Sequence, residues 1–382
     1  MVSETTCKTY FVTEIQFISM KVVFLVVDGM PDIPVKDKTP LSSAAKPNLD
    51  WLAKNGTVGE MTVLPNKMWN EQAHASISHT ANISLLGYNP EKFHLKRGPL
   101  EAVGADIPYQ EGHLAVRCNF ASVDKELTVT DRHVGRNYDG LDEITRYISQ
   151  HVDIGVPYTF MRTYEHRAVL IIKHNLSDAI TSNDPFAVGQ KIRRISATDT
   201  QSLMSAKLVQ DFVDKARGVM EFHPANKKRI SHHIPPANYL LVREAGNSLQ
   251  DLLPHFAKRW KVKNPVCIAS NGVIKATCML AGFNSVTIPE GDFQSDLDFI
   301  FENIEELQEE YDFIYAHVKK VDEPGHDGDF QKKKKMIEML DKRLESFRKF
   351  DGILVITSDH ITSSAEKKHM PGAVPLLVYG KG

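Results

Sequence analysis

The sequence predicts an α/β fold in which a mostly parallel sheet, flanked by helices, is interrupted by a smaller α+β domain. Short apolar, β-branched runs are typical of strands buried on both faces. There are four, Val22–Val27, Phe313–Val318, Ile353–Thr357 and Val374–Tyr379. Helical stretches separate them, which favours parallel pairing. From about residue 106 to residue 260 the apolar runs shorten and turn residues increase, which indicates a second domain.

Helices of the larger domain are predicted from apolar spacing and proline position. Residues 331–350 place Met336, Leu340, Leu344 and Phe347 on one stripe, which predicts an amphipathic helix. A helix over Leu41–Asn55 follows the first strand, with Pro40 and Pro47 marking its start. Residues 267–281 indicate the end of a strand and then a glycine-containing helix.

The inserted domain is predicted from shorter segments. Strands are expected at His113–Val123, Thr128–Asp131, Ala168–Lys173 and Tyr239–Arg243, and helices near Asp139–Ser149 and Ser202–Val219. We therefore expect an N-terminal extension over residues 1–19, a discontinuous α/β domain over 20–105 and 263–382, and an inserted domain over 106–262.

Composition excludes several classes of function. Lysine and arginine number 46 against 48 acidic residues, so no net charge favours nucleic acid or an anionic membrane. The run Lys332–Lys335 falls on the polar face of a predicted helix, where solvent exposure is expected. No apolar stretch approaches the roughly 20 residues needed to cross a bilayer. The cysteines are scattered without a CxxC pair, which fits a reducing, cytoplasmic setting; they are Cys7, Cys118, Cys267 and Cys278.

Carboxylates and histidines follow the ends of the predicted strands. In an open parallel sheet, ligands bind beyond the carboxyl ends of the strands. The side chains expected at that edge are Asp28, Asp322, His326, Asp359, His360 and His369. Six such ligands exceed the need of one tetrahedral ion, and two neighbouring ions suit displacement at phosphorus. The pattern therefore predicts a two-metal site.

A nucleophile for such a site is expected in the segment HASISHTANISLLGYNP, residues 74–90. It offers Ser76, Ser78, Thr80 and Ser84. A hydroxyl at a helix N-terminus is activated by the helix dipole and a metal. An ordinary N-cap serine explains the same pattern. The residues alone leave the choice among these hydroxyls open.

Taken together, the motifs resemble the archaeal-type cofactor-independent phosphoglycerate mutases of the alkaline phosphatase superfamily. The resemblance extends from Met20 over nearly the whole chain through VVFLVVDGMPDIP, SHTANISLLGYNP, RGPLEAVGADI, DRHVGR, EHRAVLIIKHNLSDAI, HVKKVDEPGHDGD and TSDH. It implies interconversion of 3-phosphoglycerate and 2-phosphoglycerate without 2,3-bisphosphoglycerate, and a phosphatase-like domain with an inserted one. The substrate is a small molecule, and neither nucleic acid nor membrane is implied.

The resemblance also implies roles for individual residues. Ser78 aligns with the serine that becomes phosphorylated. Asp322, His326 and His369 align with the ligands of one metal. The other metal would be held by Asp28, Ser78, Asp359 and His360. Two divalent ions are therefore expected, with Mn²⁺ first and Zn²⁺ or Co²⁺ also compatible with these ligands.

An anionic phosphoester with a carboxylate also requires cations. Arginine's planar fork suits both groups. The arginines in matching motifs are Arg97, Arg117, Arg132, Arg136 and Arg167, and we expect some of them to bind substrate and others to form structural ion pairs. His133 and His166 are candidate proton shuttles for the glycerate hydroxyls.

The chain departs from the family motif beside the nucleophile. The family's S-D-T-A-H is here Ser78-His79-Thr80-Ala81-Asn82, and its G-A-T-G segment is Pro289-Glu290-Gly291-Asp292. These changes leave two alternatives open. One is a metal-dependent phosphatase or a mutase for another small phosphoester, and the other is a metal-binding paralogue without activity.

Overall fold

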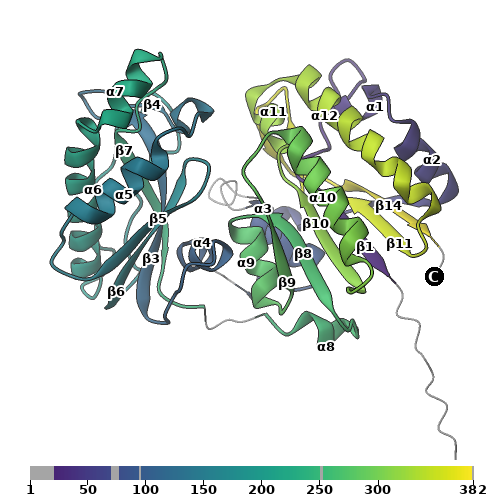
Figure 1. The fold of residues 1–382 in the computed structure, drawn as a ribbon, viewed down its shortest axis with the longest axis horizontal. Helices are drawn as coiled ribbons and strands as arrows, with labels where there is room; N and C mark the ends of the chain where they lie inside the picture. Colours follow the sequence, from purple (N-terminus) through teal and green to yellow (C-terminus); the bar gives the residue numbers. More distant parts are fainter. Residues whose placement is uncertain (1–20, 70–76, 94–95, 250–252, 381–382) are drawn as a thin grey trace, which may run out of the picture.

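The computed structural model describes residues 21–69, 77–93, 96–249 and 253–380. The predicted extension over residues 1–19 lies outside them. The two larger sheets lie side by side, with helix α4 (Arg97–Gly104) between them (Figure 1). Among the described residues the structure contains no helix that is both long and apolar enough to cross a membrane.

The larger sheet has seven strands in the order β2-β14-β11-β1-β10-β8-β9. β1 pairs in parallel with β10 and β11, and β8 pairs in parallel with β10 and β9, whereas β14 and β2 are antiparallel. The strands are β1 (Val22–Val27), β2 (Thr57–Met61), β8 (Pro265–Ser270), β9 (Asn284–Ile288), β10 (Phe313–Val318), β11 (Ile353–Thr357) and β14 (Val374–Gly380). The predicted α/β fold class and its four predicted strands are confirmed.

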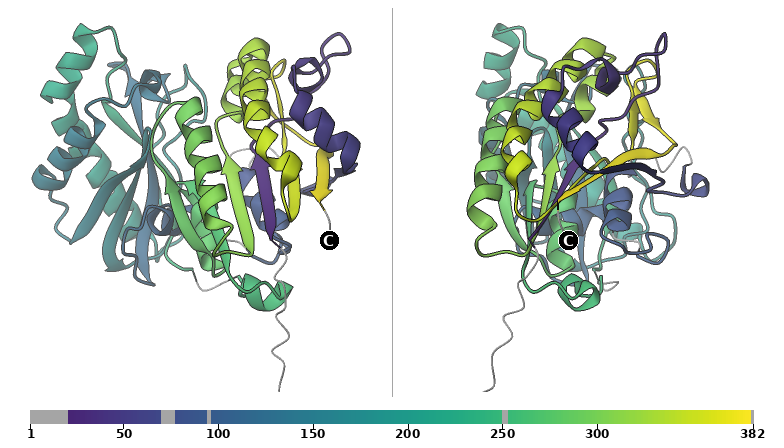
Figure 2. Two further views of the ribbon diagram at one scale, coloured as in Figure 1. Left: turned by 45° about the vertical axis from the view of Figure 1, so that its right-hand side comes forward. Right: turned by 90° about the vertical axis from the view of Figure 1, so that its right-hand side faces the viewer.

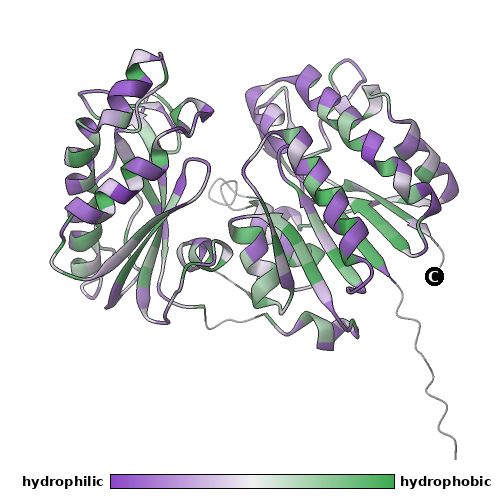
Figure 3. Cartoon of the chain, in the orientation of Figure 1, coloured by the Kyte–Doolittle hydropathy of each residue, from purple (hydrophilic) through white to green (hydrophobic). Residues whose placement is uncertain are grey.

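Helices cover both faces of this sheet, as Figure 2 shows. Alternate residues of β1 explain why both faces are buried: Val23 and Leu25 pack in one core, and Val26 packs in the other. The helices are α1 (Pro40–Ser43), α2 (Pro47–Asn55), α3 (Ile77–Leu85), α8 (Phe256–Trp260), α9 (Val273–Leu280), α10 (Phe293–Leu307), α11 (Asp322–Asp327) and α12 (Phe330–Arg343), with 3₁₀ turns η1 (Asn66–Met68) and η4 (Leu344–Lys349). Apolar residues concentrate in the strands between these helices (Figure 3).

The smaller sheet has five antiparallel strands, with β3 paired to β4, β6 and β7, and β5 paired to β6. Its strands are β3 (His113–Val123), β4 (Val129–Asp131), β5 (Tyr158–Tyr164), β6 (Arg167–Asn175) and β7 (Tyr239–Gly246). The helices with it are α5 (Leu141–His151), α6 (Leu203–Glu221) and α7 (Pro224–Ser231), and a 3₁₀ turn η3 spans Val134–Arg136. They enclose a separate apolar core. The proposed domain limits at residues 105/106 and 262/263 stay a prediction.

Three details of the predicted helices are corrected. The segment Leu41–Asn55 forms two helices, because Pro47 begins α2 as a new helix. The helix predicted over 331–350 ends at Arg343 and continues as the 3₁₀ turn η4. Lys333 is wholly buried instead of solvated, and its Nζ donates to the backbone oxygens of Pro31 and Thr362.

Candidate active site

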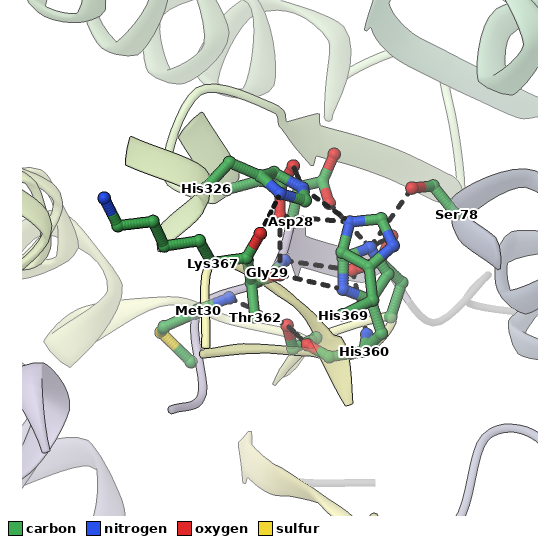
Figure 4. A network of polar contacts seen from close by, with 12 residues as sticks. Asp28, Gly29, Met30, Ser78, His326, His360, Thr362, Lys367 and His369 are labelled. Carbon is green, nitrogen blue, oxygen red and sulfur yellow. Dashed lines mark hydrogen bonds and ion pairs between the residues drawn. The ribbon is translucent and has the colours of Figure 1, made fainter. Parts of the chain in front are cut away.

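The carboxyl ends of β1, β10 and β11 bring the predicted ligands together. Asp28 directly follows β1, Asp359 and His360 follow β11, and α11 after β10 carries Asp322 and His326. His369 arrives on a short antiparallel hairpin, β12 (Ile361–Ser363) and β13 (Lys368–Met370), where it pairs with Thr362. Figure 4 shows His326, His360 and His369 gathered around Asp28.

Gly29 makes this close approach of β1 to its neighbours sterically feasible. Its φ is +57°, and a Cβ there would collide with Thr362 Oγ1 and Asp322 Oδ1. Its backbone N–H donates to Asp359 Oδ1 at 3.1 Å. The Asp-Gly pair after the first strand therefore has both a chemical and a steric reason.

One group of ligand atoms consists of Asp322, His326 and His369. Nε2 of His326 lies 3.2 Å from Asp322 Oδ2 and 2.8 Å from His369 Nε2, and His369 Nε2 lies 3.5 Å from Asp322 Oδ1. His326 Nδ1 is 3.3 Å from the Lys367 carbonyl, to which it can donate. A proton there leaves the Nε2 lone pair facing the other ligands, as in histidines that bind metals.

A second group surrounds Asp28. His360 Nε2 lies 3.2 Å from Asp28 Oδ1, 3.5 Å from Asp359 Oδ2 and 3.1 Å from Ser78 Oγ. Thr362 fixes the tautomer of His360, because its single hydroxyl proton is donated to Asp322 Oδ1 at 2.5 Å. The His360 Nδ1, 3.1 Å from the same oxygen, must then be the donor. The lone pair of Nε2 consequently faces Asp28 and Ser78.

The carboxylates crowded into both groups of ligand atoms would be stabilised by bound cations. Burial, followed by the neighbouring Asp359 and Asp322 carboxylates, raises the pKa of Asp28 well above its ordinary value. Burial also raises the pKa of Asp322, but His326 and His369 outweigh it and lower that pKa overall. His369 Nδ1 is buried without a hydrogen-bond partner among the described residues. Crowded carboxylates and inward-facing imidazoles fit divalent cations, and groups of three such ligand atoms lie within 4.8 Å of one another.

Ser78, the candidate nucleophile, lies in the first turn of α3 (Ile77–Leu85). Ser78 Oγ faces His360, whereas Ser84 Oγ donates to the Val63 carbonyl at 2.7 Å and is engaged in packing. Ser76 lies outside the described residues. Ser78 Oγ is in direct contact with one of the ligand groups.

The two residues that depart from the family motif near Ser78, His79 and Asn82, are both buried. Asn82 is fully buried, accepts a hydrogen bond from the Tyr315 hydroxyl and donates from Nδ2 to Asp359 Oδ2 at 3.3 Å. It also donates to the Ser78 carbonyl at 2.7 Å. Burial, followed by the charge of Arg97, lowers the pKa of His79 to about 4, so this ring is neutral near pH 7. The departures therefore add no charge beside the nucleophile.

A cavity of about 850 Å³ opens from this site toward the smaller sheet. All five predicted arginines line it, and so do Arg193, Arg243 and Lys319, which the sequence analysis did not single out. His133 and His166 line it too, with their ring centres 4.8 Å apart. Burial, followed by the charge of Arg167, lowers the pKa of Lys319 to about 8.

Several of these arginines are already paired. Arg117 Nη1 lies 3.4 Å from Glu101, and Arg132 Nη2 lies 2.7 Å from Asp184. Arg97 Nε lies 3.2 Å from Glu244 Oε2. Arg167 differs from them because it lies within 4.0 Å of no carboxylate in the described part of the chain, and its Nε is buried without a hydrogen-bond partner. Arg167 is therefore the predicted arginine best placed to accept a ligand anion.

Arg136 forms ion pairs between the two parts of the molecule, the part built on the smaller sheet and the part built on the larger sheet. Its guanidinium pairs with Glu323 at 3.1 Å and Asp327 at 2.8 Å, on the same short helix α11 that carries Asp322 and His326. Arg162 makes a second contact between the parts by pairing with Glu290 at 2.8 Å. Glu290 stands in the altered glycine-rich segment, so that departure contributes an ion pair that joins the two sheets.

This geometry defines an α/β protein with a candidate two-metal centre facing a cationic cavity. Comparison with known proteins shows the family to which the chain belongs. The family profile described as 2,3-bisphosphoglycerate-independent phosphoglycerate mutase matches residues 53–226. The mutase of that name from Methanosphaera stadtmanae is 35% identical, over 95% of this chain and 90% of the relative. Mutase 1 from Archaeoglobus fulgidus is 36% identical, over 94% and 88%. The chain belongs to the 2,3-bisphosphoglycerate-independent phosphoglycerate mutase family.

Solved structures agree with this assignment. A protein from Pyrococcus horikoshii superposes with a TM-score of 0.71 at 27% identity, over 95% of this chain and 88% of that one. The cofactor-independent phosphoglycerate mutase from Thermoplasma acidophilum gives a TM-score of 0.56 at 28% identity, over 95% and 90%. The resemblance to this family that the motifs indicated is confirmed.

Proposed function

We propose that this chain interconverts 3-phosphoglycerate and 2-phosphoglycerate through a phosphoserine at Ser78, without 2,3-bisphosphoglycerate. The observation that carries the proposal is the position of Ser78 Oγ, 3.1 Å from His360 Nε2 at the edge of two carboxylate–imidazole groups. The cavity beyond it is lined by arginines that suit an anion carrying both phosphate and carboxylate.

Two divalent ions would be held by the ligand sets that the resemblance implies. One set is Asp322, His326 and His369; the other is Asp28, Ser78, Asp359 and His360. When bound, such ions supply positive charge that lowers the pKa of a coordinated hydroxyl and stabilises the oxygens around phosphorus. Manganese is our first expectation, and Zn²⁺ or Co²⁺ is also compatible with carboxylates, imidazoles and one hydroxyl.

The reaction is a double transfer of one phosphoryl group. Ser78 Oγ forms a bond to phosphorus, and the bond from phosphorus to the 3-oxygen of the substrate breaks. Glycerate stays in the cavity and turns. Its 2-oxygen then forms a bond to phosphorus, and the bond to Ser78 Oγ breaks. The leaving oxygen takes up a proton at each transfer, and the attacking hydroxyl gives one up.

In this scheme the cavity residues bind the substrate, shield the phosphoserine from water and transfer protons. The arginines hold the carboxylate and phosphate, and the contacts of Arg136 and Arg162 across the two parts help to exclude water from the phosphoserine. A group with a pKa near neutrality can both give and accept a proton. Lys319, with a pKa of about 8, meets this requirement, whereas burial lowers the pKa of His133 to about 4 and that of His166 well below its ordinary value. Lys319 is therefore a better candidate proton carrier than the two histidines.

The test is an assay that separates transfer to glycerate from transfer to water. Metal-free protein is incubated with 3-phosphoglycerate and Mn²⁺, and both 2-phosphoglycerate and free phosphate are followed. We expect 2-phosphoglycerate to form without added 2,3-bisphosphoglycerate, with little phosphate released. Release of phosphate alone would contradict the mutase and support the phosphatase alternative. Inertness of the metal-loaded protein would favour an inactive paralogue.

A further inference from the structure

A buried histidine that no part of the proposed site uses, His317, is directed at the Asp28 group. It lies near the end of β10, where Ile314, Ala316 and Val318 pack in the core on one face of the sheet. Because side chains alternate along a strand, His317 points to the opposite face, the one where α3 carries Ser78.

Strand register puts His317 one same-face position before the metal-ligand positions. Val26 of β1 pairs with both His317 of β10 and Thr357 of β11. Asp28 and Asp359 lie two residues beyond Val26 and Thr357, and therefore on the same face of the sheet. The parallel pairing of three neighbouring strands thus brings one imidazole and two carboxylates to the same face, with the imidazole two residues before the carboxylates.

The atoms themselves converge. His317 Nε2 lies 3.9 Å from Asp28 Oδ2, and the ligand atoms of Asp28, His317 and Asp359 all lie within 4.8 Å of one another. The His317 side chain is 3% exposed, and its Nε2 has no hydrogen-bond partner in the described residues. The distance to Asp28 is too long for a hydrogen bond. A buried ring nitrogen that faces carboxylates without bonding to them lacks the partner that burial normally requires.

We propose that His317 Nε2 is a further ligand of the divalent ion held by Asp28 and Asp359. This inference rests on the two-ion site of the proposed function, and it adds an imidazole to the set of Asp28, Ser78, Asp359 and His360. A second imidazole makes this position more selective for Mn²⁺, Zn²⁺ or Co²⁺ over Mg²⁺, which prefers oxygen ligands.

Metal titration of the whole protein tests the role of His317 without relying on activity. Metal-free wild type, His317→Gln and a control are titrated with Mn²⁺, and free Mn²⁺ is measured by electron paramagnetic resonance. The control is His223→Asn, since His223 is a buried histidine that caps α7 in the smaller part. We expect His317→Gln to weaken one ion by at least about tenfold and leave the other unchanged, and the control to match wild type.

The outcomes separate this inference from the proposed function. Two ions bound equally well by wild type and His317→Gln would overturn the role of His317 and leave the mutase mechanism intact. A wild type that binds no Mn²⁺ would remove the basis of both. A double-variant cycle sharpens the result: His317→Gln and Asp359→Asn should lose affinity non-additively if they share an ion, whereas His317→Gln and His326→Gln should act independently.

A measurement on unaltered protein covers the case in which His317→Gln does not fold. Each histidine bound to Co²⁺ carries a ring N–H whose proton signal is strongly shifted by the paramagnetic ion. In the Co²⁺-loaded protein we expect one such exchangeable signal each from His317, His326, His360 and His369. One signal fewer, with both ions bound, would contradict the proposal.

Discussion

The two parts of the molecule contribute opposite charges to one cavity, and they do so by different structural means. In the larger part, carboxylates and imidazoles gather because parallel strands end at the same edge of the sheet. In the smaller part, arginines reach the cavity from separate strands and turns of an antiparallel sheet, where no single edge collects them. The ligand groups are consequently built into the sheet topology, whereas the cationic wall depends on how the two parts meet.

The largest effect is expected at the nucleophile, in the part with parallel strands. Ser78→Ala removes the oxygen that would carry the phosphoryl group, so turnover should fall by at least about a thousandfold. Metal content should fall by one ion at most, because Asp322, His326 and His369 are untouched. Steady-state assays and elemental analysis check both statements. Thr80→Val, two residues along α3, is the control and should keep most activity.

Removing a ligand from the other ion should have nearly as large an effect. His369→Ala leaves only Asp322 and His326 in a group of three. We expect a folded protein that has lost most activity and one of its ions, as measured by circular dichroism and elemental analysis. Prolonged EDTA should abolish wild-type activity, and Mn²⁺ should restore it. Full activity after exhaustive chelation would contradict the metal site itself.

Removal of a cation from the smaller part should act mainly on substrate binding. Arg167→Gln deletes the positive charge of the predicted arginine that forms no ion pair with a carboxylate among the described residues. We expect KM for 3-phosphoglycerate to rise roughly tenfold. Arg146→Gln, at an exposed position of α5, serves as the control. A change in kcat with KM unaffected would place Arg167 outside substrate binding.

Loosening the contact between the two parts should have a smaller effect of a different kind. Glu290→Gln weakens the two-pronged pair with Arg162, whose Nη1 and Nη2 lie 2.8 and 2.9 Å from the carboxylate oxygens. Water should then reach the phosphoserine more often, so the ratio of free phosphate to 2-phosphoglycerate should rise a few-fold. Glu309→Gln breaks an exposed pair with Lys21 within the larger part and should leave this ratio unchanged. If the ratio is also unchanged in Glu290→Gln, the pair between Arg162 and Glu290 does not help to exclude water from the phosphoserine.

The smallest expected effect concerns pH. Burial, followed by the charge of Arg167, lowers the pKa of His166 well below its ordinary value of 6.5. Below pH 6.5 the unfolded chain therefore binds a proton that the folded chain does not, and stability falls as pH falls. His166→Gln should reduce the loss of unfolding free energy between pH 7 and pH 5, as measured by urea denaturation. His151→Gln, exposed at the end of α5, should not alter it.

The contrast between the parallel sheet of the larger part and the antiparallel sheet of the smaller part explains which features could be predicted from the sequence. The β-branched runs predicted the sheet, and the residues after them predicted which carboxylates and histidines gather at its edge, because a parallel sheet leaves few alternatives. Their role as metal ligands stays a prediction. His317 was missed because a histidine inside an apolar run carries no local signal, and only register with Val26 reveals its position. The burial of Lys333 was missed because a run of four lysines on a helix suggests solvent, whereas tertiary contacts with Pro31 and Thr362 decide it.

The cationic wall was predictable only in part. Arginines in motifs could be named, but Arg193 and Arg243 reach the cavity through packing between the two sheets, which no local pattern records. Lys319 directly follows β10 and was missed although it lies at the predicted edge of the larger sheet. Helix α10 was not predicted, and β5 was also missed, because Met161 at its middle is exposed and its apolar pattern is weak. The use of Arg136 in ion pairs with α11 likewise depends on the meeting of the two parts.

The most direct test of the central claim is to locate the phosphoryl group during turnover. Protein is mixed with 3-phosphoglycerate and Mn²⁺, quenched in acid within the first turnovers, digested and analysed by mass spectrometry. We predict a phosphate on the peptide containing Ser78, with fragment ions that assign it to Ser78, and none in Ser78→Ala. Phosphate on Thr80, or formation of 2-phosphoglycerate by Ser78→Ala at the wild-type rate, would contradict the account.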